Sequence, residues 1–256
     1  MTGAAHPRDT AAEAAIGRRQ VDDALAYLGM RDDWPLPPPA PGSWSRPGRD
    51  ESEAMMRALI AAGLEPRMPI VFDLRMLRPA FAPNLLLVEV LTRAGPVGRS
   101  RAVSMVAGVA PGHVFAFDGS PVGVPALCAA GFLAVPDGPA ALAWLIFYGQ
   151  VAASPNGAFH ILRSVDDLPA PPPDAATVRL VARVADPPAI TPDGDGSFRI
   201  EAALLQADVL ARAVFTVGRD GAVAMVDNEP VAAGLKVPVC GLREGLRQVL
   251  GQVGPA

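Results

Sequence analysis

The chain has 256 residues and a formal net charge of −4; hydrophobic residues make up 50% of it and charged residues 19%. This composition is typical of globular proteins and excludes an intrinsically disordered chain. The negative net charge gives no general attraction to nucleic-acid phosphates or to an anionic membrane, so we expect no nucleic-acid partner.

The first predicted element is an amphipathic helix near the amino terminus. Thr10-Ala11-Ala12-Glu13 has the form of a capping box, in which the hydroxyl and the carboxylate each accept a bond from a free backbone N–H group. Val21, Leu25 and Leu28 then form one apolar stripe, and Gly29 is a plausible end. Residues 1–15 lack the basic start and apolar run of a secretory signal, so we expect a cytoplasmic protein.

Residues 34–48 read WPLPPPAPGSWSRPG and cannot form a regular helix or strand, because proline removes backbone donors and fixes φ. We therefore expect residues 1–48 to form an amino-terminal helix followed by a proline-rich arm. In one interpretation Trp34 and Trp44 on this arm dock on a partner protein. In the other, which we favour, the arm lies across its own domain.

The region 49–168 is predicted to form an α+β lobe. Asp50 and Glu53 repeat the capping pattern, which predicts a helix over Asp50–Ala62. Apolar runs bounded by turn residues predict strands within 68–77, 84–93, 99–109 and 113–117. For Val124–Leu133 the periodicity does not choose between a helix and a buried strand.

The stretch 139–153 predicts a central helix. Pro139 suits the first helical turn, and Gly138 or Asp137 can supply the cap. Its apolar side chains point in every direction, so protein or lipid must surround it, and about 15 residues is too short for a bilayer span. We expect a sheet or a second subunit to cover it; one such arrangement is a homodimer that buries Leu145 and Phe147 across a two-fold axis.

Beyond the central helix, residues 158–165 predict a strand, and the proline run 168–174 is a candidate boundary between two lobes. The region 174–256 is expected to be an antiparallel β meander with strands within 177–185, 198–206, 208–217 and 222–230. Leu242–Leu250 is expected to close the chain as a short helix. An alternative is that 174–256 forms one continuous domain with 49–168. The predicted class is α+β, with a sheet-rich carboxyl half.

The chain has three histidines, His6, His113 and His160, so any histidine-dependent site must use one of them. The nearest approach to a nucleophile and base is His113 with Asp118 and either Ser120 or Cys128, which would suit a small hydrolase. No G-x-S-x-G motif surrounds Ser120, and Cys128 lies in an apolar stretch. For His160, inside an apolar strand, a hydrogen-bonded position in the protein interior is the favoured interpretation.

Metal and cofactor signals are also weak. Asp208, Asp227 and Glu229 could together form an oxygen-ligand metal site, although solvated acidic residues at strand ends are the favoured interpretation. No phosphate-binding glycine loop is present, so we expect no cofactor. Candidate binding residues are Trp34, Trp44, Tyr148 and His160. The sequence thus favours a non-catalytic binding, assembly or accessory protein that contacts another protein chain or a second copy of itself, with the hydrolase as the alternative.

Overall fold

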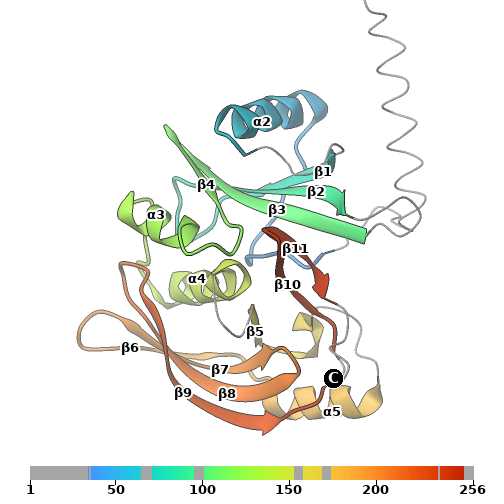
Figure 1. Cartoon of the computed structure of the whole chain (residues 1–256). Helices are drawn as coiled ribbons and strands as arrows, with labels where there is room; N and C mark the ends of the chain where they lie inside the picture. Colours follow the sequence, from blue (N-terminus) through green and yellow to red (C-terminus); the bar gives the residue numbers. More distant parts are fainter. Residues whose placement is uncertain are drawn as a thin grey trace, which may run out of the picture.

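The computed structural model describes residues 34, 36–64, 71–94, 101–152, 158–168, 174–235 and 237–250. Four α-helices and eleven strands make up this part of the chain. Figure 1 shows them in layers: helix α2, a first sheet, helices α3 and α4, a second sheet, and helix α5. The predicted α+β class, with a central helix and a sheet-rich carboxyl half, is confirmed. The helix predicted before Gly29 lies outside the described residues.

The first sheet is antiparallel and has the order β1-β2-β3-β11-β10, with β4 also paired to β3. Its strands are β1 (Val71–Leu77), β2 (Leu86–Ala94), β3 (Arg101–Ala110), β4 (His113–Ala116), β10 (Val239–Arg243) and β11 (Leu246–Leu250). One edge of β3 is shared: β11 meets it at Ser104, and β4 pairs with 107–110. The last two strands of the chain therefore complete the sheet formed by the first ones.

The second sheet is also antiparallel, with the order β5-β7-β8-β9, and β6 pairs with the first half of β7. Its strands are β5 (Phe159–Leu162), β6 (Ala189–Pro192), β7 (Phe198–Gln206), β8 (Val209–Val217) and β9 (Val223–Ala232). The predicted hairpin of β8 and β9 is confirmed. Strand β5 precedes the proline run 168–174 and pairs with β7 after it, and β11 after the run pairs with β3 before it. Both sheets therefore contain strands from both sides of the predicted boundary. Independent folding of the two sides stays a prediction.

Helix α4 (Gly138–Val151) is the predicted central helix, and it lies between the two sheets. The Asp137 carboxylate accepts a bond from the N–H of Ala140, and proline occupies the first turn. Side chains from both sheets surround the helix, so Leu145 and Phe147 are 0% exposed within a single chain. The homodimer that would bury these two residues across a two-fold axis is therefore wrong, because their surface is already covered. No described helix has the length and hydropathy needed to span a membrane.

Helix α2 (Arg49–Ala61) covers the outer face of the first sheet through Leu59, which is fully buried. The predicted capping pair is wrong: the residue at the N-cap is Gly48, and Glu53 instead pairs with Arg49 at 2.9 Å. Gly63 terminates the helix as predicted, two residues after its last residue, Ala61. Gly63 has φ of +81°, its N–H bonds Ile60, and the next N–H bonds Leu59, which is the Schellman arrangement.

Helix α5 (Ala175–Val184) replaces a predicted strand and covers the outer face of the second sheet. Asp174 caps it by accepting a bond from the N–H of Thr177 at 2.7 Å. Thr177, Val181 and Val184 are the buried side chains, a spacing of four and three residues that matches a helix. The alternation of apolar and basic residues in this segment fits a strand, but the buried side chains follow the helical spacing.

The predicted closing helix over 242–250 is also wrong, because the chain forms the β10–β11 hairpin there. Glu244 and Gly245 lie between the strands with φ of +56° and +77°. Two consecutive positive φ values are the geometry of a type I′ turn, which reverses the chain and cannot belong to a right-handed helix.

Two smaller elements complete the fold. Helix α3 (Gly123–Ala129) resolves the segment for which helix and strand were both open, and a 3₁₀ turn, η1 (Val165–Asp167), follows β5. The described part of the proline-rich arm lies across its own domain, as favoured: Leu36 is 2% exposed, and Ser45 forms a bridge to Met76 in β1.

Candidate functional site

The residues proposed for hydrolysis are spread along β4 and the segments that follow it. His113 begins β4, and the backbone ladder continues to Phe117, whose N–H bonds Val106. Because an extended strand rises about 3.3 Å per residue, His113 and Phe117 lie about 13 Å apart, with Asp118 beyond the far end. The carboxylate of Asp118 accepts a bond from the N–H of Ser120, so it caps its own turn. This geometry gives the proposed triad no support.

The environments of His113 and Cys128 also give no support to a catalytic role. The ring of His113 is exposed, packs against Phe115 and Phe132, and has Nδ1 3.0 Å from the carbonyl of Pro111. Partial burial, with the nearby Asp220 charge, raises the pKa of the Cys128 thiol. A reactive cysteine needs a lowered pKa, so Cys128 is poorly suited to act as a nucleophile.

The three metal-site candidates lie at different places on the second sheet. Asp227 and Glu229 are both exposed on β9, opposite Val214 and Arg212. Asp208 lies in the β7–β8 turn, where its carbonyl accepts a bond from the N–H of Leu235. Among the described residues no group of three or more His, Cys, Asp or Glu side chains is arranged to hold a metal ion.

Both candidate tryptophans contact an arginine of their own chain. The guanidinium carbon of Arg75 is 4.3 Å from the ring centroid of Trp34 and 5.0 Å from that of Trp44. Trp44 also donates to the carbonyl of Ala40 at 2.9 Å. Tyr148 packs edge-on against Trp144 in the core. The two indoles thus hold the arm against β1 through cation–π contacts.

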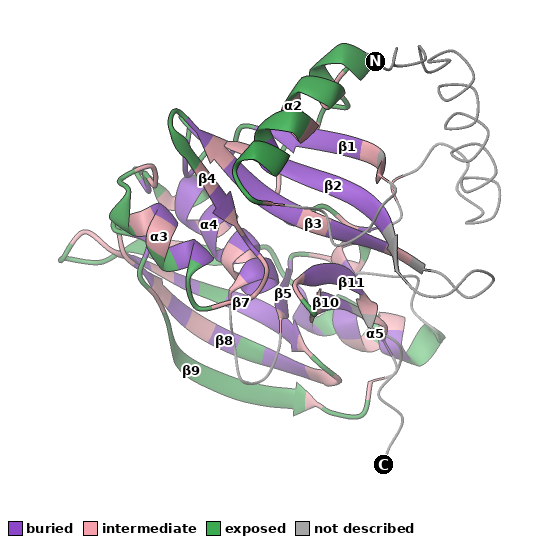
Figure 2. Cartoon of the chain, turned by 45° about the horizontal axis from the view of Figure 1, so that its top comes forward, coloured by how far each residue is buried: buried purple, intermediate pink, exposed green. Residues whose placement is uncertain are grey.

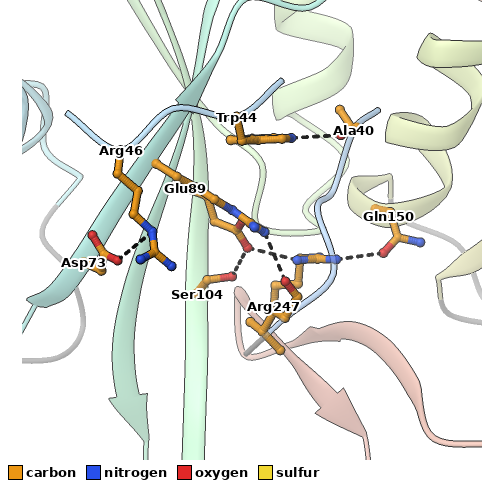
Figure 3. A network of polar contacts seen from close by, with 10 residues as sticks. Ala40, Trp44, Arg46, Asp73, Glu89, Ser104, Gln150 and Arg247 are labelled. Atoms are coloured by element: carbon orange, nitrogen blue, oxygen red, sulfur yellow. Dashed lines mark hydrogen bonds and ion pairs between the residues drawn. The ribbon is translucent and has the colours of Figure 1, made fainter. Parts of the chain in front are cut away.

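A cluster of buried polar side chains lies where the carboxyl-terminal hairpin meets the first sheet and α4 (Figure 3). We call it the Glu89 network, and its members are Arg75, Glu89, Ser104, Gln150, His160 and Arg247. Of these residues, only His160 is a candidate that the sequence alone indicates. One signal was available: Glu89 stands alone in the apolar run of β2, and a carboxylate buried there requires a charged partner.

Glu89 is the centre of this network and is 0% exposed. Its Oε1 accepts from Ser104 at 2.5 Å and from Arg247 at 2.9 Å, and its Oε2 accepts from Nε of Arg75 at 2.7 Å. Arg75 also donates to the carbonyl of Leu36 on the arm at 3.2 Å. One carboxylate therefore connects β1, β2, β3, β11 and the arm.

Gln150 extends the network from α4 to the second sheet. Its Oε1 accepts from Arg247 at 3.3 Å, and its Nε2 donates to the carbonyl of Phe159 at 2.9 Å. The same amide nitrogen lies 3.1 Å from Nδ1 of His160. Because a carbonyl can only accept, the amide orientation is fixed, and Nδ1 of His160 must be an acceptor.

His160 is consequently neutral, with its proton on Nε2, which donates to the carbonyl of Cys240 at 2.9 Å. Burial lowers the pKa of His160 from 6.5 to about 4, and the charge of Arg247 adds to this effect, while the bond to Cys240 opposes it. Both ring nitrogens are occupied, so this imidazole is not available as a general base. The network therefore holds secondary-structure elements together and offers no reactive group. Nε of Arg247 has no hydrogen-bond partner among the described groups.

A cavity of about 340 Å³ lies between the arm and α4 and borders Gln150 and His160. Their polar atoms already bond within the network. At its rim, Arg163 and Asp167 pair at 2.6 Å. Burial raises the pKa of Asp167, but the bonds from Arg163 outweigh this and lower it overall. The polar groups of Gln150 and His160 that border this cavity are therefore already hydrogen-bonded within the protein.

Exposed apolar side chains are most numerous on β9. Among the described residues, five large hydrophobic side chains are exposed, and three of them belong to this strand: Met225 at 41%, Val226 at 52% and Val231 at 42%. Figure 2 shows β9 exposed along nearly its whole length. Its one paired edge faces β8, and no described strand pairs with the other edge.

No family model, no curated protein and no solved structure matches this chain.

Proposed function

We propose that this chain is a non-catalytic protein-binding protein whose binding surface is the free edge of β9. The observation that carries the proposal is the concentration of exposed apolar side chains on this one strand, Met225, Val226 and Val231. Exposed apolar side chains that gather in one place mark interaction sites. An unpaired strand edge also offers rows of backbone N–H and C=O groups to an extended peptide.

The charges beside this edge favour one kind of partner. Asp227 and Glu229 lie on β9. They line a groove of about 440 Å³ on the face of the second sheet, which also carries Asp186, Glu201 and Arg212. A second copy of β9 would bring carboxylates against carboxylates, which disfavours self-pairing. An extended segment carrying Lys or Arg would meet opposite charges.

Pro230 limits the length of the binding edge. Proline has no N–H to donate and is tolerated in sheets mainly on edge strands. The segment available for pairing is therefore Val223–Glu229, which is long enough for a short added strand. We infer that the partner supplies an extended, basic and partly apolar segment of similar length.

The test is photo-crosslinking in the cells from which the protein comes. The full chain carries a photoreactive phenylalanine at Val226 or, as a matched control, at Val122, which is 65% exposed and lies at the N-cap of α3, outside β9. We expect a discrete crosslink from position 226 to a basic, extended segment of another protein, and no such crosslink from position 122. Equal crosslinking from both positions, or crosslinks only between copies of this chain, would contradict the proposal.

A peptide with the crosslinked sequence then gives a quantitative measurement. We expect its affinity for the full chain, measured by fluorescence anisotropy, to fall at least tenfold in D227N/E229Q and in V226P, because the first removes the complementary charge and the second blocks pairing. R57Q, on the opposite side of the fold, should bind as the wild type does. Unchanged affinity in both β9 variants would refute the binding surface.

A further inference from the structure

We propose that residues 10–29 of this chain bind as an amphipathic helix in the groove between α2 and β1. This groove, which we call the α2 groove, has a volume of about 420 Å³. It is lined by Ser52, Glu53, Met56, Arg57, Ile60, Val71, Asp73 and Leu74. It lies on the far side of the fold from β9, so the inference is independent of the proposed function.

The α2 groove presents apolar side chains that the described residues leave partly uncovered. Ile60 is 48% exposed, and Met56 is only half-buried beside it. Figure 2 shows most of α2 exposed, and Leu59 is its one fully buried residue. A helix that leaves apolar side chains in water on a groove wall is a suitable surface for a second apolar stripe.

The sequence supplies such a stripe in the same chain. Val21, Leu25 and Leu28 follow the spacing of one helix face, and the residues between them are charged or small except for Tyr27. A helix with this pattern is stable only when its apolar face is covered. Residues 10–29 lie outside the described part of the chain, so their location is the content of the proposal.

The path of the arm brings this segment to the groove. The Trp34 ring is 6.0 Å from the guanidinium carbon of Arg46, and Nε of Arg46 is 3.2 Å from a carboxylate oxygen of Asp73. Asp73 lines the α2 groove, so the described chain begins next to it. From Gly29 to Trp34 an extended chain reaches about 17 Å, which is sufficient for a helix ending at Gly29 to lie in the groove.

The tether also favours this occupant over a separate molecule. A segment attached by a short linker acts at an effective concentration of the order of millimolar, which an external ligand seldom matches. The rim of the groove carries both signs of charge, on Glu53, Arg57 and Asp73. Residues 18–23 also carry both signs, since Arg18-Arg19 and Asp22-Asp23 lie within one turn of each other. Neither surface repels the other.

The experiment places a photoreactive phenylalanine at Ile60 in the full chain and maps the crosslinks by mass spectrometry. We expect crosslinks to residues 16–28 of the same chain, with a yield that does not change over a hundredfold dilution. In L25D/L28D this yield should fall at least tenfold, whereas R19Q, on the polar face of the same segment, should retain it. A photoreactive group at Val122 is the positional control and should give no crosslink to 16–28.

Hydrogen exchange on the same proteins provides a second readout. Amides of residues 55–61 should exchange at least fivefold faster in L25D/L28D than in the wild type, because their cover is lost. Crosslinks between chains, crosslinks to another region, the absence of any crosslink, or an L25D/L28D variant that behaves as the wild type would each overturn the proposal. Circular dichroism of both variants verifies that the fold is retained.

Discussion

Removing the charge of Glu89 tests the energetic importance of the network most severely. In E89Q the amide cannot neutralise Arg75 and Arg247, which are 6% and 0% exposed, so two buried cations lose their counter-charge. Breaking a buried ion pair by removing one partner costs about 3–5 kcal/mol. Whole domains are stable by about 5–15 kcal/mol, so this one substitution should remove a large part of the total.

The assay is urea unfolding followed in parallel by tryptophan fluorescence and far-ultraviolet circular dichroism. E201Q is the matched control, because Glu201 forms an exposed pair with Arg199 at 3.3 Å, with side chains 58% and 41% exposed. Exposed pairs contribute about 0–1 kcal/mol, so E201Q should unfold near the wild-type midpoint.

A double variant separates the ion pair from general damage. In E89Q/R247M one buried cation has been removed together with its partner. The decrease in the free energy of unfolding should therefore be smaller than the sum of the decreases in E89Q and R247M, by about 1–3 kcal/mol. If E89Q loses less than 1 kcal/mol, or if the two losses simply add, the network does not connect the carboxyl-terminal hairpin to the first sheet in the way described.

Two further predictions concern the helix α4 region. His160 has its pKa lowered to about 4, so between pH 6.5 and 4 the unfolded chain binds a proton that the folded chain does not; the stabilisation is fully present above pH 6.5 and falls by about 3 kcal/mol as the pH drops to 4. Urea unfolding at a series of pH values should show this slope in the wild type, and a persisting slope in H160Q would contradict it. A Cβ on Gly149 would lie 2.6 Å from the ring of Phe159, so G149A should lose about 1–3 kcal/mol by overpacking. G194A, where an added Cβ meets nothing within 4 Å, should not, and equal thermal unfolding temperatures for the two variants would refute the tight contact.

The sequence was sufficient for elements whose patterns have one interpretation. The central helix had a proline in its first turn, a capping aspartate and no polar face, and the structure contains it as α4. The strands β2, β3, β7 and β8 were recognisable as apolar or alternating runs between turn residues. These signals are local, so tertiary contacts were not needed to interpret them.

The incorrect predictions lie in segments whose apolar residues fit both the helical and the strand periodicity. In 177–185 the apolar residues alternate, but Thr177, Val181 and Val184 also share a helix face, and the cap at Asp174 decides the outcome. In 242–250 the apolar residues fit a helix, but Glu244 and Gly245 form a turn with two positive φ values. A short apolar segment does not determine its own structure, and the neighbouring sheet selects one form.

The Glu89 network could not be assembled from the sequence. Glu89 and Arg247 are 158 positions apart and meet because the last hairpin joins the first sheet. Nothing in the local pattern of either strand predicts that pairing. The β9 edge was predicted as a strand, but its exposure depends on where the sheet ends and on how far α4 extends beneath it, which are properties of the assembled fold.

The most direct test of the proposed function is hydrogen exchange of β9 in the full chain, measured with and without the peptide identified by crosslinking from Val226. Pairing at a strand edge protects backbone amides that point outward, which occur at every second residue. The register of β9 shifts by one residue at Val226, so the account predicts slower exchange at the outward-pointing amides on either side of Val226 within Val223–Glu229 on addition of the peptide, with α2 and α4 unchanged. Protection elsewhere in the chain with β9 exchanging as before would contradict it.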